Sequence, residues 1–406
     1  MFGDVPLVLV DSDEKLVNAV DAMRGLPAIA VDLEADSFHH YREKVCLIQV
    51  SIPGTDYVID TLAVSGLDPL ATLLSDPDQI KVLHGCDYDV VSLKRDYGIH
   101  LHGLFDTMIG AQFLNLPRLG LADLLSSTFA VGLDKRFQRH DWARRPLLDV
   151  HLEYARGDTH WLLAMREVLQ YRLARAGWVD AVAEECRLLE KREWQGRTPD
   201  PGDFLRTKGA TGLDQAGNRV LRAVYEYRES QGKSMDRPVF KVIPDQVLAA
   251  VARRRPVDLD ELGTLVRRSS GLMRQHGTAL VNAVAVGLAD ERPMPKAPAR
   301  KKPRSVGGPA SAPVVERLKT WRSRQVKKDN LPPAIIGSNA VLKEVARVLP
   351  RTPAELEAIP ELRSWQVERY GAQLLQVVAE GLEEAKPQSK SKRRRRRRKT
   401  APSSSE

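Results

Sequence analysis

The stretch Ala28-Ile-Ala-Val-Asp-Leu-Glu34 decides the fold of the first part of the chain. Its apolar first half predicts a β-strand, and Asp32 and Glu34 follow with one residue between them. Because side chains alternate between the two faces of a strand, both carboxylates would lie on one face. A buried carboxylate pair is costly unless cations neutralise it, since desolvation and mutual repulsion add together. The stretch therefore predicts a strand that carries a metal site.

The residues around this strand predict an α/β domain. Further β-rich runs are Val45–Ser51, Tyr57–Ile59 and Ile80–Leu83, separated by polar or Gly- and Pro-containing turns. Asp87–Tyr97 has the apolar spacing of a helix, and a long helical stretch runs from Leu147 to about Trp194. Strands followed by helices indicate one α/β domain, which we place at residues 1–200.

Carboxylates recur at two later edges of predicted elements. Asp87 and Asp89 follow the run Ile80–Leu83, and we favour Asp89 as the functional one because the other can cap a helix. Tyr154 and Asp158 are four residues apart, which would place them on one helix face. An isolated Asp-x-Glu is usually a strand end in solvent, but four carboxylates suit two divalent ions, Mg²⁺ or Mn²⁺. The set is Asp32, Glu34, Asp89 and Asp158. Two such ions serve phosphodiester hydrolysis.

A second group of residues is a candidate for contact with RNA, namely His84, Arg139, Trp142 and Arg145. A basic groove with an aromatic platform binds single strands without reading their sequence. A solvated loop explains the basic cluster around Trp142 equally well, and His84 at a strand end is more simply a structural histidine. The three cysteines form no CxxC pair, so neither a disulfide framework nor a zinc site is expected.

The rest of the chain reads as two helical modules with a spacer and a tail. Residues 212–288 and 312–383 repeat the same order of helices, Pro-containing turns and a glycine that precedes an apolar helix. Residues 289–311 form a basic linker rich in Pro and Gly, and 384–406 a polybasic tail expected to be disordered. The tail could bind RNA or act as a targeting signal.

Charge and hydropathy exclude several classes of protein. The 406 residues include 62 Lys and Arg against 53 Asp and Glu, and the excess lies between Lys390 and Lys399. No run approaches the roughly 20 apolar residues that a membrane helix needs, and the N-terminus lacks the basic flank of a secretion signal. We expect a cytoplasmic protein with no membrane partner and no obligate protein partner.

At its carboxylate motifs the chain resembles the RNase D branch of the DEDD 3′→5′ exonucleases, in the subgroup with tyrosine in the last motif. The matching motifs are Asp32-Leu-Glu34, His84-Gly-Cys-Asp-Tyr-Asp89 and Tyr154-Ala-Arg-Gly-Asp158. The resemblance implies an RNase H-like fold with a mixed central sheet. It also implies metal ligation by Asp32, Glu34, Asp89 and Asp158, and positioning of the attacking water by Tyr154. The two helical modules resemble HRDC domains.

The resemblance implies a metal-dependent 3′→5′ exoribonuclease that trims stable RNA with a free 3′ end, with tRNA precursors as the expected substrate. Two alternatives remain at this point. One is a DNA-directed 3′→5′ exonuclease, because the motifs do not choose the sugar. The other is a non-catalytic RNA-binding protein that uses its helical modules and tail. Against this second alternative, a fold that had lost catalysis would normally lack at least one of the four carboxylates, and all four are present.

Overall fold

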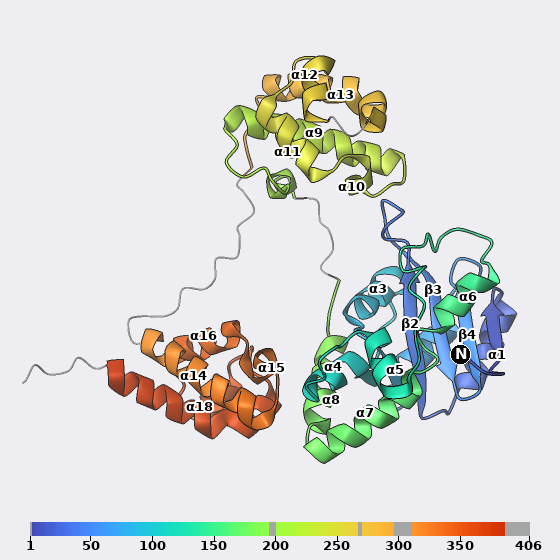
Figure 1. Ribbon diagram of the computed structural model, residues 1–406, viewed down its shortest axis with the longest axis vertical. Coiled ribbons are helices and arrows are strands. Elements are labelled where there is room, and N and C mark those ends of the chain that lie inside the picture. Colours follow the sequence, from blue (N-terminus) through green and yellow to red (C-terminus); the bar gives the residue numbers. More distant parts are fainter. Residues whose placement is uncertain (1, 195–199, 267–269, 296–310, 386–406) are drawn as a thin grey trace, which may run out of the picture. The chain divides into compact units, whose positions relative to one another are not determined.

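The computed structural model describes residues 2–194, 200–266, 270–295 and 311–385. The chain forms two compact units, Met1–Pro303 and Arg304–Glu406. The first unit contains an α/β domain followed by a helical module, and the second contains another helical module (Figure 1). This confirms the predicted fold class. Within the described ranges, every helix falls short of the length and apolar character that a membrane crossing requires.

The α/β domain is built on a mixed sheet of six strands in the order β1-β4-β3-β2-β5-β6. The strands are β1 (Leu7–Val10), β2 (Ala28–Ala35), β3 (Val45–Ile52), β4 (Thr55–Asp60), β5 (Ile80–Leu83) and β6 (Leu104–Asp106). Strand β3 is antiparallel to β2 and β4, whereas β1–β4, β2–β5 and β5–β6 are parallel pairs. The four strands predicted from the sequence coincide with β2 to β5.

The central position of β2 sets the place of the first two carboxylates. Its pairing with β5 covers Ala28–Ala30 only, while its pairing with β3 continues to Ala35 with a register shift after Glu34. Asp32 and Glu34 therefore lie beyond the last β2–β5 pair, at the open end of the sheet. The apolar half of β2 is fully buried, so the strand is anchored in the core just before the carboxylates.

Eight helices surround the sheet in the described part of this domain. They are α1 (Asp13–Met23), α2 (Asp68–Leu74), α3 (Asp87–Tyr97), α4 (Thr107–Phe113), α5 (Leu121–Phe129), α6 (Asp149–Arg156), α7 (Leu162–Ala176) and α8 (Val179–Glu190). Helix α7 packs against β2 and β5, and α6 packs against β1, β3 and β4. Both helices thereby flank the sheet near the carboxylates of β2.

The predicted helical stretch after Leu147 is broken into three helices. Helix α6 ends at Arg156, and Gly177 takes the left-handed conformation, with φ of 72°, after α7. The prediction that Tyr154 and Asp158 share one helix was therefore wrong. Asp158 lies in the turn after α6, where its backbone N–H donates to the Ala155 carbonyl at 3.3 Å.

The two helical modules repeat one plan. The first has a 3-10 turn η1 (Asp203–Arg206) and then α9 (Gln215–Ser234), α10 (Val239–Val242), α11 (Asp245–Arg254), α12 (Leu259–Leu265) and α13 (Ser270–Ala289). The second has α14 (Ser311–Asp329), α15 (Pro333–Gly337), α16 (Asn339–Val348), α17 (Pro353–Glu357) and α18 (Ser364–Ala385). Left-handed residues stand at matching positions, Asp236 with Asn330 and Arg255 with Leu349. Most of the predicted linker and nearly all of the predicted tail lie outside the described residues.

Candidate active site

Three separate segments bring the four predicted carboxylates to one end of the sheet. Asp32 and Glu34 extend from β2, Asp89 stands in the first turn of α3, and Asp158 stands in the turn after α6. All four residues are partly exposed. Carboxylates with this exposure are accessible to ions from solvent, while their neighbours in the sheet are buried.

The four carboxylates lie close enough to shift one another's ionisation. Burial is the main cause that raises the pKa of Asp32 well above its ordinary value, and repulsion from Asp158, Asp89 and Glu34 adds to it. The pKa of Glu34 is raised by burial and then by Asp158 and Asp89. Because repulsion from neighbouring carboxylates accounts for part of the shifts of Asp32 and Glu34, the four groups lie near one another.

Asp89 lies near Asp32 and Glu34 and raises the pKa of both, whereas Asp87 is engaged in an ion pair with Arg192. Burial raises the pKa of Asp89 to about 7, with a further contribution from Asp106. Burial likewise raises the pKa of Asp158 to about 7. Asp87 is exposed and pairs with Arg192 at 2.9 Å. The structure thus distinguishes two carboxylates that the sequence places side by side at the start of α3.

The donor chemistry of this site fits hard divalent cations. Carboxylate oxygens are the ligands that Mg²⁺ and Mn²⁺ prefer, and a cation offsets both the burial and the repulsion that raise these pKa values. In the described residues, no three His, Cys, Asp or Glu side chains already converge closely enough to hold a metal ion. The fit therefore rests on the type, charge and accessibility of the four oxygen donors.

A buried ion-pair network fixes the turn that carries Asp158. The two basic residues on either side of it, Arg156 and His160, both bond to Asp56 of β4, at 2.8 Å from Nε and from Nδ1 respectively. Hydrogen bonds to His160, Ser51 and Arg156 outweigh burial and hold the pKa of Asp56 below its ordinary value. Asp56 therefore anchors the turn between α6 and α7 to the sheet.

Tyr154 lies within an aromatic cluster beside the carboxylates. Its ring centroid is 5.7 Å from that of Trp142 and 5.6 Å from that of Phe137, and the residue is 8% exposed. Burial, followed by the negative charges of Asp158 and Glu34, raises the pKa of Tyr154 well above its ordinary value. The side chain is therefore a neutral phenol that can donate a hydrogen bond into the site.

Trp142 occupies a different place from the one that its sequence context suggested. It is 1% exposed and packs against Tyr154, so in this structure it offers no free face to a nucleic-acid base. Among the described residues, the indole N–H of Trp142 makes no hydrogen bond of ordinary geometry. The indole nevertheless interacts weakly with the Glu34 carboxylate, and this interaction lowers the pKa of Glu34 and so opposes the effect of burial. Trp142 is thus placed to support Glu34 and Tyr154.

The other three candidate RNA contacts are spread around the site. The Arg145 guanidinium bonds to Asp60 at 2.6 Å and to the Trp142 carbonyl at 2.7 Å, which fixes the Trp142 loop to β4. His84 is half-buried, with Nδ1 2.9 Å from the Thr107 hydroxyl. Arg139 is exposed and lies over the Phe38 ring at 5.9 Å. Of the four, only the Arg139 side chain is free to meet a ligand from solvent.

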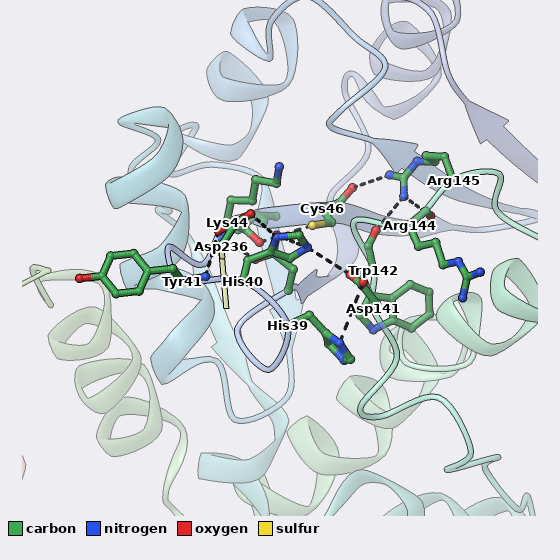
Figure 2. Close-up of polar contacts among 12 residues, drawn as sticks. His39, His40, Tyr41, Lys44, Cys46, Asp141, Trp142, Arg144, Arg145 and Asp236 are labelled. Atoms are coloured by element: carbon green, nitrogen blue, oxygen red, sulfur yellow. Dashed lines mark hydrogen bonds and ion pairs between the residues drawn. The ribbon is translucent and has the colours of Figure 1, made fainter. Parts of the chain in front are cut away.

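A cluster that sequence reasoning did not assemble joins the loop between β2 and β3 to the first helical module (Figure 2). His40 Nδ1 lies 2.7 Å from Asp236, and His40 Nε2 lies 3.4 Å from Asp141 and 3.9 Å from Asp36. The backbone N–H of Tyr41 donates to Asp236 at 3.1 Å, and its hydroxyl donates to Glu229 at 3.0 Å. The pair His39-His40 was the available signal, but Asp236 is distant in sequence and could not be assigned to it.

Comparison with family models assigns the parts of the chain. Residues 7–174 match a 3′-5′ exonuclease model, and residues 217–284 and 311–378 each match the HRDC domain. The chain therefore contains a 3′-5′ exonuclease domain followed by two HRDC domains. The four carboxylates and Tyr154 all lie within the exonuclease match.

Individual relatives agree with this assignment. Ribonuclease D of Gluconacetobacter diazotrophicus is 27% identical over 373 residues, which is 91% of this chain and 92% of that protein. The exosome complex component 10 homolog of Drosophila melanogaster is 30% identical over 68% of this chain, but this chain spans only 31% of its length. The crystal structure of Escherichia coli RNase D, "an exoribonuclease involved in structured RNA processing", superposes with a TM-score of 0.63 at 26% identity, covering 92% of this chain and 99% of that one.

Proposed function

Because this chain belongs to the 3′-5′ exonucleases that carry HRDC domains, we propose that it is a metal-dependent exoribonuclease that removes nucleotides from the 3′ end of RNA. The observation that supports this most is the set of four partly exposed carboxylates, whose pKa values are all raised by burial and, for Asp32 and Glu34, also by repulsion from the neighbouring carboxylates. A fold that served only to bind RNA would gain nothing from this repulsion. The relatives named ribonuclease D support RNA as the substrate class.

Asp32, Glu34, Asp89 and Asp158 would hold two divalent ions, Mg²⁺ or Mn²⁺. When bound, such ions acidify water and stabilise the charge that develops on a leaving oxygen. The protein's own part is to keep the four carboxylates together on β2, α3 and the turn after α6. Their raised pKa values mean that ligand-competent carboxylates become more abundant as the pH rises toward and above about 7.

Tyr154 would orient the attacking water or a phosphate oxygen through its hydroxyl proton. Its raised pKa keeps that proton in place at neutral pH. Packing of the ring against Trp142 and Phe137 limits its rotation, so the hydroxyl is held in a defined direction. Arg145 contributes indirectly by fixing the loop that carries Trp142.

The substrate in this proposal is RNA with a free 3′ end, and precursors of tRNA are the substrate that we consider first. We place the reaction in the cytoplasm, because the chain matches a bacterial ribonuclease D over 91% of its own length and 92% of that protein's length.

The direct experiment is incubation of a 5′-labelled tRNA precursor with the purified chain in Mg²⁺ or Mn²⁺, with and without a chelator. We expect stepwise shortening from the 3′ end with metal and none with chelator. A DNA strand of the same sequence forms the second arm. Faster digestion of the DNA strand would favour the DNA-directed alternative, and no digestion of either strand would refute the proposal.

A further inference from the structure

The first HRDC module contains a polar pocket that the exonuclease mechanism does not use. It has a volume of about 190 Å³ and lies between the segment after α9 and helix α13. Its lining residues are Met235, Arg237, Lys241, Val242, Pro244, Leu272, Gln275 and His276. The polar groups among them are two cations, an amide and an imidazole, and none is acidic. A pocket of this composition suits an anion.

The two cations of the pocket are available to a ligand. Arg237 and Lys241 are exposed, and neither side chain makes a hydrogen bond or an ion pair with another residue in the described ranges. Most other arginines of this module are engaged, for example Arg222 with Asp290 and Arg228 with Asp245 at 2.6 Å. Arg237 and Lys241 thus carry positive charge that the folded module does not neutralise.

His276 adds a directional group at the floor of the pocket. It is 3% exposed, and its Nδ1 lies 2.9 Å from the Tyr227 hydroxyl. When that hydroxyl donates to Nδ1, the proton of the neutral ring resides on Nε2, which can donate to an anionic oxygen. Gln275, the residue before it on α13, lies at the exposed rim, where its side-chain amide donates to Met235 Sδ at 3.9 Å and keeps a second N–H for a ligand.

The second HRDC module provides an internal comparison, because the two modules can be aligned residue by residue. Arg228 donates to the Ile243 carbonyl at 3.3 Å, and Arg322 donates to the Gly337 carbonyl at 2.7 Å, which fixes the correspondence. With this register, Leu331 stands at the position of Arg237. Leu331 is 1% exposed, whereas Arg237 is exposed.

Other pocket positions differ as well, and Gln275 corresponds to Arg369, a cation that the second module pairs internally. Ile335 stands where the first module has Lys241, and Tyr370 stands where it has His276. Asp329, at the position of Met235, accepts hydrogen bonds from Tyr370 at 2.8 Å and from Arg369 at 3.4 Å. The second module therefore has apolar residues and an internal acid–base contact where the first has unneutralised cations. The same fold does not require these cations.

The pocket adjoins the contact between the first HRDC module and the exonuclease domain. Its residues Met235 and Arg237 flank Asp236, which bonds to His40 in the loop that follows β2. That loop leads back to Glu34 and Asp32 of the candidate active site. An anion in the pocket would thus lie beside the loop that leaves the catalytic strand.

We propose that the pocket formed by Arg237, Lys241, Gln275 and His276 binds a phosphate group of the RNA strand whose 3′ end occupies the exonuclease site. This inference rests on the proposed function for the identity of the strand. Phosphate contacts of this kind hold a nucleic acid in register and carry no sequence information. The first module is then a substrate-holding domain, and the second lacks this phosphate site.

The test uses the double variant Arg237→Leu/Lys241→Ile, in which each cation is replaced by the residue that stands at the same position in the second module. The control is Lys208→Ile/Arg254→Leu, which removes the same charge from exposed positions of the same module outside the pocket. Binding of a labelled oligouridylate to the full chain is measured in chelator over a series of salt concentrations. Because no metal is present, this binding result holds whether or not the chain is a nuclease.

We expect the pocket variant to bind the oligouridylate several-fold more weakly than the control. Its plot of log affinity against log salt should be shallower by about 0.7 for each phosphate that the variant no longer neutralises. Equal affinity and equal slope for the two variants would overturn the proposal. Should the double variant fail to fold, as judged by its circular dichroism melt, Lys241→Gln alone is compared with Lys208→Gln under the same criterion. Failure of the proposed function would show separately, as absence of Mg²⁺-dependent cleavage by the wild-type chain.

Discussion

At the scale of single residues, the sequence predicts the acidic part of the candidate site better than its aromatic and basic parts. Asp32, Glu34 and Asp89 each stand at the edge of a recognisable element, so local pattern was enough to bring them together. Trp142 and Arg145 lie in a loop without periodicity. Whether such a side chain faces solvent or packs beneath the site depends on tertiary contacts, which a local pattern does not contain.

Substitution Tyr154→Phe tests the role of the phenol. The phenyl ring keeps its packing against Trp142 and Phe137, so the melting temperature should change little. The loss of the positioned proton should lower kcat on the order of 10²-fold with a smaller change in KM. Steady-state kinetics on a short RNA measures both constants, and an unchanged kcat would exclude a positioning role for the hydroxyl.

Substitution Trp142→Ala tests whether this residue supports the site from below or stacks on RNA. Removal of an indole that is 1% exposed should cost about 3–5 kcal/mol of the free energy of unfolding. The exposed control Arg139→Ala should cost less than about 0.5 kcal/mol. Urea denaturation of both variants gives the comparison. Equal stability of the two, with weaker RNA binding by Trp142→Ala, would instead indicate a surface stacking platform.

At the scale of elements, four of the six strands were predicted. Strand β1 is an apolar run as long as β5, so its sequence carried a strand signal that the prediction overlooked, whereas β6 has only three residues and depends on pairing with a neighbour. The break between α6 and α7, which begins at Gly157, was missed because apolar residues recur at helical intervals on both sides of it. This break determines where Asp158 lies, since it places the carboxylate in a turn anchored through Asp56.

The contact between the loop after β2 and the first HRDC module should depend on pH. The hydrogen bond to Asp236, with smaller contributions from the charges of Asp36 and Asp141, raises the pKa of His40 above 6.5. A group whose pKa is raised on folding stabilises the folded state fully below its unfolded value, and this contribution is lost as the pH rises through the folded value. The contact should therefore be firmer in mild acid than in mild base.

Melting curves of the wild type and of His40→Gln measure this contribution. We expect the difference in stability between the wild type and the variant to be larger at about pH 6 than at about pH 9. An unperturbed histidine has a pKa of about 6.5, so the charge of His40 is present at the lower pH and lost at the higher one. The control His102→Gln alters an exposed histidine whose nearest carboxylate, that of Glu190, lies 3.5 Å away. A difference that stays constant with pH would show that His40 does not act through its charge.

At the scale of the whole molecule, charge is concentrated outside the enzyme-like body. The chain has a formal charge of +9, which equals the excess carried by the basic run from Lys390 to Lys399. Length and composition could therefore indicate nucleic acid as a partner, but they could not identify a reaction. The reaction is indicated by four acidic residues of a body that is neutral overall.

Deletion of residues 386–406 tests the part played by the basic run. Affinity for RNA should fall, and the plot of log affinity against log salt should become shallower by about 0.7 for each phosphate that the run neutralises on a single strand. Metal-dependent cleavage of short oligonucleotides should persist, because the four carboxylates and Tyr154 all lie before Trp161. Loss of that cleavage would contradict this division of roles.

The most direct test of the central claim compares two neighbouring aspartates of α3 in one assay. Asp89 is partly exposed and belongs to the carboxylate site, whereas Asp87 is exposed and pairs with Arg192. The wild type, Asp87→Asn and Asp89→Asn are each incubated with a 5′-labelled RNA in Mg²⁺, and products are separated at single-nucleotide resolution. We predict stepwise shortening from the 3′ end by the wild type and by Asp87→Asn, and none by Asp89→Asn. Shortening by Asp89→Asn at the wild-type rate would contradict the proposed site.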